Sequence, residues 1–302
     1  MSDNNQPPSP VIIECAINGA TRKQRNPNVP RSPEEIRTDV IACLDAGASI
    51  IHAHNAQFRL LGREAADDYL AAWRPLMAQR PDTLWYATGV AASSIKDRLA
   101  HLEILADELG PAMPMAYVDP GSTNVAWLGP DGLPTGYSYS HSFEDVKAFF
   151  GLCERRGMAP SVAIYEPGWL QTTLHYHRAG RLPRGAMIKL YFCGPFDIFG
   201  RGRGASYGLP PTEAALMAYL DMLQGRGLAW SVSVWGGDLM ETPLPRLALE
   251  LGGHLHVGLE EYAGQRQPTN VELIAECVAL AHEVGRPVAT CAQAREILGI
   301  SQ

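Results

Sequence analysis

The amino-acid sequence predicts a single-domain α/β fold, a (β/α)₈ TIM barrel. Short apolar runs rich in β-branched residues alternate with helical segments through most of its 302 residues, which is typical of parallel strands joined by helices. The length suits a barrel of about 250 residues with some decoration. A doubly wound open sheet is the competing fold, but no GxGxxG motif follows a strand to support it. We expect right-handed crossovers and an active site at the carboxyl ends of the strands.

The strands and helices can be placed in order along the chain. The first helix has the clearest boundaries: Ser32 and Glu35 form a Ser-x-x-Glu capping box, and Gly47 suits the helix end. Pro33 suits the first helical position. Strands are expected at residues 11–17, 49–55, 83–88, 115–118, 161–165, 186–192, 230–234 and 254–257. Helices are expected at residues 33–46, 64–79, 95–109, 143–156, 213–223, 244–251, 270–283 and 292–298.

No change of composition marks a second domain. We expect residues 11–302 to form the barrel and residues 1–10, which are polar and rich in proline, to form a flexible tail. The longest irregular stretches, 119–141 and 193–211, both follow strands and are rich in glycine and proline. Long loops at that end of a barrel usually form the substrate pocket.

Composition limits the classes of function. Hydrophobic residues make up 46% of the chain and charged residues 19%, and no segment approaches the roughly 20 apolar residues of a membrane span. A formal net charge of -7 argues against a nucleic-acid-binding face. The six cysteines lack paired spacing, and the N-terminus lacks the features of a secretory signal. We expect a cytoplasmic protein with reduced thiols and small-molecule partners.

A histidine pair ends the second predicted strand. In SIIHAHN, His52 and His54 are two residues apart, so both imidazoles share one face of the strand and can bind one metal ion. The alternative is that one histidine packs in the core while the other bonds a carbonyl. Glu260 follows the eighth strand, which in a barrel neighbours the first and so lies near the second. Two histidines and one carboxylate form a catalytic rather than a structural ligand set, although Glu260 and Glu261 could also begin a solvated helix.

Three segments together resemble a known family. IIHAHN, IYEPGW and GGHLHVGLEEY are similar to motifs of the beta-keto acid cleavage enzymes, which are zinc-dependent barrels, and the resemblance extends from about residue 11 to residue 298. It implies condensation of a β-keto acid with acetyl-CoA, followed by release of acetoacetate and a new acyl-CoA. It implies no organic cofactor bound to the enzyme, and a homo-oligomer, either a dimer or a tetramer.

The resemblance also implies roles for individual residues. Zinc, or another divalent metal, would be bound by His52, His54 and Glu260. Catalysis would use Glu261 as the base, supported by His256 and Glu166. The residues expected to bind substrate are Thr88, Ser122, Asn124 and Asn18.

Three departures from the family pattern concern residues expected to take part in the reaction. Glu261 stands where the family has an aspartate base, His256 where it has a relay arginine, and Ala87 where it has a serine. These departures keep two other hypotheses open. One is a ligand-binding barrel that retains zinc without turnover. The other is a metal-dependent hydrolase of the amidohydrolase type, although such enzymes usually carry their HxH motif on the first strand.

A basic loop follows the first strand. Residues 20–25 read ATRKQR where the family has an amine-selecting glutamate, which favours a substrate tail that is neutral or anionic. The alternative is a solvated basic loop. Arg201 and Arg203 could contact CoA phosphates or could simply be exposed. Lys189 and Glu14 lie in apolar strands. Lys189 could be a catalytic residue or could simply form an ion pair, and Glu14 could be the buried partner of a cation.

Overall fold

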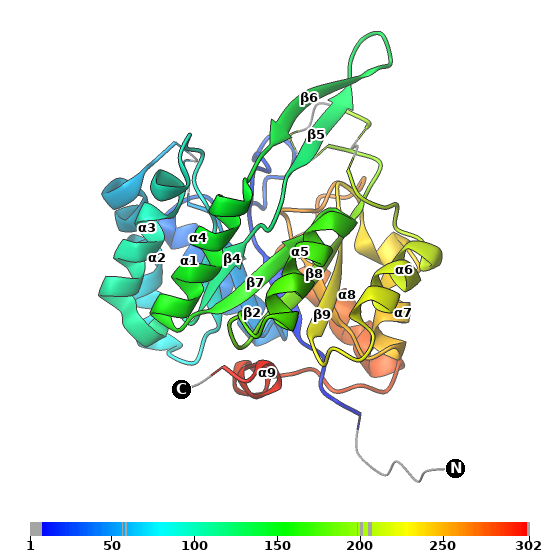
Figure 1. Ribbon diagram of the computed structural model, residues 1–302. Helices are drawn as coiled ribbons and strands as arrows, with labels where there is room; N and C mark the ends of the chain where they lie inside the picture. Colours follow the sequence, from blue (N-terminus) through cyan, green and yellow to red (C-terminus); the bar gives the residue numbers. More distant parts are fainter. Residues whose placement is uncertain are drawn as a thin grey trace.

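The predicted (β/α)₈ fold is confirmed. The computed structural model describes residues 8–55, 57, 59–197, 199, 202–204 and 207–300. An 8-stranded sheet has the order β3-β2-β1-β10-β9-β8-β7-β4, and its neighbouring strands pair in parallel. The sheet curls into a nearly closed barrel with helices around it (Figure 1). No ladder joins β3 to β4 in the described part of the chain.

Strands and helices alternate as expected, with boundaries shifted by a few residues. The barrel strands are β1 (Ile13–Ala16), β2 (Ile50–Ala53), β3 (Trp85–Ala87), β4 (Met115–Val118), β7 (Ala159–Ile164), β8 (Met187–Cys193), β9 (Ala229–Trp235) and β10 (His254–Val257). The helices are α1 (Pro33–Ala46), α2 (Gly62–Gln79), α3 (Ile95–Leu109), α4 (Phe143–Arg156), α5 (Pro167–Arg178), α6 (Glu213–Leu223), α7 (Leu244–Glu250), α8 (Asn270–Glu283) and α9 (Cys291–Leu298). Short 3₁₀ turns are η1 (Gly110–Ala112) and η2 (Leu239–Glu241).

Local sequence chemistry sets the ends of α1. The Ser32 side chain accepts a hydrogen bond from the backbone of Glu35, and the Glu35 side chain accepts one from the backbone of Ser32, which completes the predicted capping box. Gly47 ends the helix with φ 117°, a conformation that glycine adopts without a steric penalty. These ends fix where β2 begins, and β2 carries the histidine pair.

The stretch 119–141 is more ordered than predicted. It contains an antiparallel hairpin, β5 (Thr123–Leu128) paired with β6 (Pro134–Tyr139), which projects from the barrel beyond the carboxyl ends of the strands (Figure 1). Of the Gly and Pro residues that suggested an irregular loop, Gly129, Pro130 and Gly132 lie in its turn, where Gly132 has φ 77°, whereas Pro134 and Gly136 lie within β6. The backbone N–H of Leu128 donates to the carbonyl of Arg203, so the hairpin contacts the long loop after β8.

The opposite end of the barrel is closed by the C-terminal segment. α9 lies across it in Figure 1, and Val11 exchanges backbone hydrogen bonds with Pro287 and Ala289. Arg286 donates from Nε to the Ser9 carbonyl at 3.0 Å. Residues 1–7 of the predicted tail and Arg201 lie outside the described residues. No helix in the described part of the chain has both the length and the apolarity that a membrane crossing requires.

Candidate metal centre and active site

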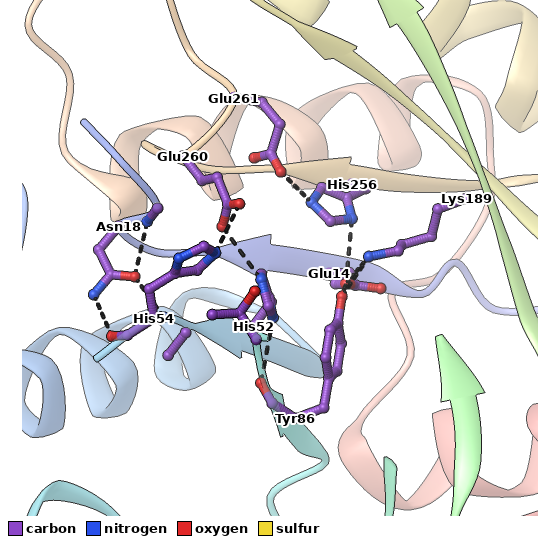
Figure 2. A network of polar contacts seen from close by, with 12 residues as sticks. Glu14, Asn18, His52, His54, Tyr86, Lys189, His256, Glu260 and Glu261 are labelled. Carbon is purple, nitrogen blue, oxygen red and sulfur yellow. Dashed lines mark hydrogen bonds and ion pairs between the residues drawn. The ribbon is translucent and has the colours of Figure 1, made fainter. Parts of the chain in front are cut away.

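The three predicted metal ligands lie together at the carboxyl ends of β2 and β10. His54 Nε2 is 2.9 Å from Glu260 Oε1, and His52 Nε2 is 3.4 Å from Glu260 Oε2. The ligand atoms of all three residues lie within 4.8 Å of one another. The predicted path from strand to strand is correct, because β1 pairs with both β10 and β2. Figure 2 shows the Glu260 carboxylate facing both imidazoles.

Hydrogen bonds orient each histidine. His52 lies with its Nδ1 3.3 Å from the carbonyl oxygen of Tyr86, which leaves Nε2 to face Glu260. Its ring stacks on the Tyr86 ring with 4.4 Å between centroids. His54 is held through its backbone: Asn18 Nδ2 donates to its carbonyl at 2.9 Å, and its N–H donates to Asn18 Oδ1 at 2.8 Å. A metal-binding histidine usually has its second ring nitrogen fixed, as the Tyr86 carbonyl does here for His52 Nδ1.

Two glycines bring Glu260 into place. Gly258 has φ 145°, and a Cβ there would lie 2.0 Å from the carbonyl oxygen of Ala16. Gly19 has φ 49°, and a Cβ there would lie 2.3 Å from Glu260 Cγ. The backbone N–H of Glu260 donates to the Ala16 carbonyl at 3.1 Å. The loops after β1 and β10 can therefore approach closely enough to seat the carboxylate only because glycine occupies both positions.

The protonation states suit a metal. Burial lowers the pKa of His52 to about 3, so the imidazole is neutral at physiological pH. Burial would raise the pKa of Glu260, but the two neighbouring histidines outweigh it and lower the pKa to about 2. Donor atoms about 2 Å from a tetrahedral ion lie about 3.3 Å apart, which is close to the spacing of these nitrogen and oxygen atoms. The neutral His52 imidazole, the His54 imidazole and the Glu260 carboxylate thus form a donor set that fits a divalent metal such as zinc.

A second group of polar residues lies beside the metal-ligand group. His256 Nε2 is 3.0 Å from Glu261 Oε1, and His256 Nδ1 is 3.2 Å from Glu14 Oε1. The strand register places Glu14 of β1 beside His256 of β10. His256 therefore contacts Glu261, and Glu14 is buried beside His256 and Lys189, in the role of a cation's partner that was expected for it. Figure 2 shows the imidazole between the two carboxylates.

These contacts make His256 a fixed positive charge. Burial would lower its pKa, but Glu261 and Glu14 outweigh burial and raise the pKa to about 9. Burial raises the pKa of Glu261, against the lowering effect of His256. A carboxylate with a raised pKa is a stronger base. Its second oxygen, Oε2, makes no hydrogen bond to any described residue.

Two tyrosines of this group, Tyr86 and Tyr191, are not among the residues predicted from the sequence. Tyr86 donates its hydroxyl hydrogen to Glu14 Oε1, and Lys189 Nζ donates to the Tyr86 hydroxyl at 2.5 Å. Tyr191 donates to Glu261 Oε1 at 3.4 Å. Strand parity was the available signal, because Tyr86 is two residues before Thr88 and Tyr191 is two residues after Lys189.

The other predicted site residues lie around the hairpin and strand ends. Ser122 Oγ donates to the carbonyl of His141 at 3.0 Å, at the base of the hairpin. Asn124 on β5 accepts a hydrogen bond from Ser138 at 2.8 Å and is exposed. Glu166 precedes α5 and accepts a hydrogen bond from the Thr123 hydroxyl at 2.7 Å. Among the described residues, no hydrogen bond or ion pair joins Glu166 to His256 or Glu261.

Two further predicted residues have mainly backbone partners. Thr88, just after β3, is half-buried, and its carbonyl is 2.7 Å from His101 Nε2. The Asn18 amide group also donates to the Pro30 carbonyl at 3.3 Å and accepts from the Gly19 N–H at 2.9 Å. Since its donors and its acceptor all have backbone partners, the described contacts of Asn18 hold His54 and the loop after β1.

Cavities open among the loops at this end of the barrel. One of about 710 Å³ is lined by Glu166 and by residues of the loop after β8, including Cys193 and Tyr207. Another, of about 560 Å³, is lined by Arg22 and Arg25 of the basic loop. Lys23 of the same loop is not part of this lining, and its Nζ lies 2.5 Å from Glu35 Oε1. Arg203 is exposed, with its guanidinium 5.4 Å from the centre of the Phe196 ring.

The fold and site together define a barrel enzyme class in which a metal-donor set and a buried carboxylate lie side by side at the strand ends. The sequence model of the beta-keto acid cleavage enzyme family matches residues 10–300. The chain belongs to this family, which confirms the resemblance inferred from its motifs.

Characterised relatives align along nearly the whole chain. The 3-keto-5-aminohexanoate cleavage enzyme of Acetoanaerobium sticklandii is 26% identical over 302 residues, covering 97% of this chain and 99% of that protein. The 3-oxoadipate:acetyl-CoA acetyltransferase of Cupriavidus necator is 25% identical over 299 residues, covering 96% and 95%. A solved structure, the ternary complex of ObcA with C4-CoA adduct and oxalate, superposes with a TM-score of 0.66 at 18% identity, covering 90% and 68%. At that identity the likeness shows the fold alone.

Proposed function

We propose that this protein is a zinc-dependent enzyme that condenses a β-keto acid with acetyl-CoA and releases acetoacetate and a new acyl-CoA. The observation that carries the proposal is the pairing of a metal-donor set with a buried base. Glu260 faces His52 and His54, while the adjacent Glu261 is held by His256. The names of the relatives include both cleavage of a β-keto acid and acyl transfer from acetyl-CoA.

A divalent metal bound by His52, His54 and Glu260 would supply a Lewis acid that polarises the keto oxygen of the substrate. Glu261 accepts the proton from the carbon between the two carbonyl groups of the β-keto acid. Its raised pKa strengthens it for this task. His256 carries a positive charge beside Glu261 and holds the carboxylate in position.

The carbon that lost the proton attacks the acetyl carbonyl of acetyl-CoA, and the CoA thiolate leaves. The thiolate then attacks the original keto carbon, and the bond between that carbon and the former nucleophilic carbon breaks. Acetoacetate and the new acyl-CoA result, and the proton held on Glu261 returns to the acetoacetate carbon. Atoms and charges balance without an added redox partner or an organic cofactor.

The loops supply the candidate substrate contacts. We assign Ser122, Asn124 and Thr88 to substrate orientation, and Glu166 to the wall of the larger cavity. Asn18 is assigned to positioning His54, because its amide hydrogen bonds are made with backbone groups. The exposed Arg203 remains a candidate for contact with CoA phosphates.

We further propose that the substrate tail is neutral or anionic. Arg22 and Arg25 line a cavity beside the loop that follows Glu261, and cations favour carboxylates. The name of one relative specifies 3-oxoadipate, a dicarboxylate. Turnover should therefore be faster with a β-keto acid that ends in a carboxylate than with one that ends in an amine. Faster turnover of the aminated substrate would contradict the assignment.

One assay separates this function from its two rivals. Purified protein is incubated with zinc and a panel of β-keto acids, with and without acetyl-CoA, and the products are identified by mass spectrometry. Formation of acyl-CoA and acetoacetate supports the proposal. Hydrolysis without acetyl-CoA would indicate a metal-dependent hydrolase, and binding without conversion would indicate a ligand-binding barrel.

A further inference from the structure

A buried ion pair in the barrel interior is not explained by the metal or the substrate. Lys189 Nζ on β8 lies 3.5 Å from Glu14 Oε1 on β1, and the two side chains are 4% and 0% exposed. Replacing a buried ion pair with apolar residues of similar size is often neutral or stabilising. The demands of folding therefore give little reason for these charges to be here.

One oxygen atom links the pair to the active site. Glu14 Oε1 contacts Lys189 Nζ, the Tyr86 hydroxyl and, at 3.2 Å, His256 Nδ1. The other nitrogen of the same ring lies 3.0 Å from Glu261 Oε1. His256 thus lies between two carboxylates, with Glu14 on its Nδ1 side and Glu261 on its Nε2 side (Figure 2).

Lys189 in turn fixes Glu14 and Tyr86. Its ammonium group donates to the Tyr86 hydroxyl at 2.5 Å and lies 4.9 Å from the centre of that ring. The Tyr86 ring also stacks on the ring of His52. The backbone carbonyl of Tyr86 is the partner of His52 Nδ1. One tyrosine therefore contacts both the metal-ligand group and the carboxylate that holds His256.

We propose that Glu14 and Lys189 are positioning residues for the base Glu261. Lys189 fixes Glu14, Glu14 fixes the His256 ring, and His256 fixes the Glu261 carboxylate. An arginine at position 256 would bring a planar fork with several donors, whereas an imidazole has one donor at each end and needs a partner on Nδ1 to set its orientation. The inference rests on the proposed function, in which Glu261 removes the proton.

The test uses Glu14→Gln and Lys189→Met, together with a double variant that carries both changes. The double variant leaves neither member of the pair as an isolated buried charge, so it keeps the test open if a single variant fails to fold. Three quantities are measured: bound zinc per chain, kcat and KM separately, and the rate at which acetoacetate exchanges its α-hydrogens with deuterium oxide without CoA.

We expect kcat and the exchange rate to fall about 10- to 100-fold in all three variants, with zinc content and the KM for acetyl-CoA unchanged. The matched control is Asp39→Asn, which removes a half-buried carboxylate on α1 that accepts a hydrogen bond from Asn270. This control should keep the wild-type kcat. Wild-type exchange in Glu14→Gln, or a fall in kcat accompanied by an equal fall in zinc content, would overturn the proposal.

A His256→Arg background tests the mechanism of positioning. Because arginine brings its own fork of donors, adding Glu14→Gln to His256→Arg should cost little, and an equal loss in both backgrounds would overturn the proposal. Hydrogen exchange needs the base but not acetyl-CoA. If the wild type exchanged hydrogens but formed no acyl-CoA, the proposed function would fail, while the exchange rates would still decide the role of Glu14 and Lys189.

Discussion

His256 shows how a substitution can preserve a charge while changing the group that carries it. The family resemblance places an arginine at this position, and arginine is always protonated. A histidine is not, but here Glu14 and Glu261 lie on either side of the ring and raise its pKa to about 9. The positive charge beside the base is therefore retained at neutral pH, through Glu14 on the neighbouring strand β1 and Glu261 just after β10.

The raised pKa of His256 predicts how stability depends on pH. The folded protein holds the proton more tightly than the unfolded chain, so the stabilisation is complete below about pH 6.5 and is lost as the pH rises through about 9. Urea unfolding of metal-free protein should show this loss between those values. His256→Arg should lack it, because its charge does not titrate. The same pH dependence in both proteins would contradict the assignment.

Asp39 predicts a second pH effect, away from the active site. Burial raises its pKa from 3.8 to about 6, despite the hydrogen bond from Asn270. The folded state therefore favours the protonated form, and stability should fall by on the order of 2 kcal/mol as the pH rises from about 4 to about 6. Asp39→Asn should remove this dependence, as judged from the difference in unfolding free energy between the two proteins. A constant difference across that range would rule it out.

At the scale of the element, two loops meet to seat Glu260. Gly19→Ala would place a Cβ against the Glu260 side chain, so zinc affinity should fall by at least about tenfold, as for loss of a supporting group around a metal. Gly157→Ala is the matched control. Gly157 also has a left-handed backbone, with φ 65°, but has open space around it. The control should lose about 1 kcal/mol of stability and no zinc affinity. Equal zinc binding by Gly19→Ala and wild type would contradict the role given to this glycine.

Elements with strong local signals were predictable, and those without were not. The Ser32–Glu35 capping box and the Gly47 stop were confirmed because they depend only on residues a few positions apart. The hairpin after β4 was missed, since its glycine and proline residues favoured an irregular loop while its pairing depends on contacts between two exposed strands. Helix α5 is not among the helices expected from the sequence, because the glycine and proline at its start suggest a turn as readily as a first helical position.

At the scale of the whole molecule, the order of strands in the barrel made the metal-ligand group predictable. Glu260 is 206 residues from His54, yet the neighbouring positions of β10, β1 and β2 bring them together. The group of buried polar contacts around Glu14, which includes Tyr86, Lys189 and His256, was less predictable. Whether Lys189 reaches Glu14 depends on side-chain length and direction across the barrel interior, and strand parity alone does not determine either.

The family resemblance predicts a dimer or tetramer, and the projecting hairpin exposes the large apolar residues Leu128, Leu133 and Tyr137. Sedimentation equilibrium should give a mass of two or four times the 32.8 kDa chain. A single species of chain mass at micromolar concentration would contradict a stable oligomer.

We propose that a metal held by His52, His54 and Glu260 works beside Glu261 to exchange acyl groups between a β-keto acid and acetyl-CoA. The most direct measurement is the amount of new acyl-CoA formed from a carboxylate-tailed β-keto acid by wild-type protein, after removal of metal and after zinc is restored. We predict acyl-CoA and acetoacetate in equal amounts, lost on chelation and regained with zinc, while His52→Ala forms neither product at any zinc concentration that restores the wild type. Acyl-CoA formation that survives complete removal of metal, or zinc-loaded wild type that forms none, would contradict the account.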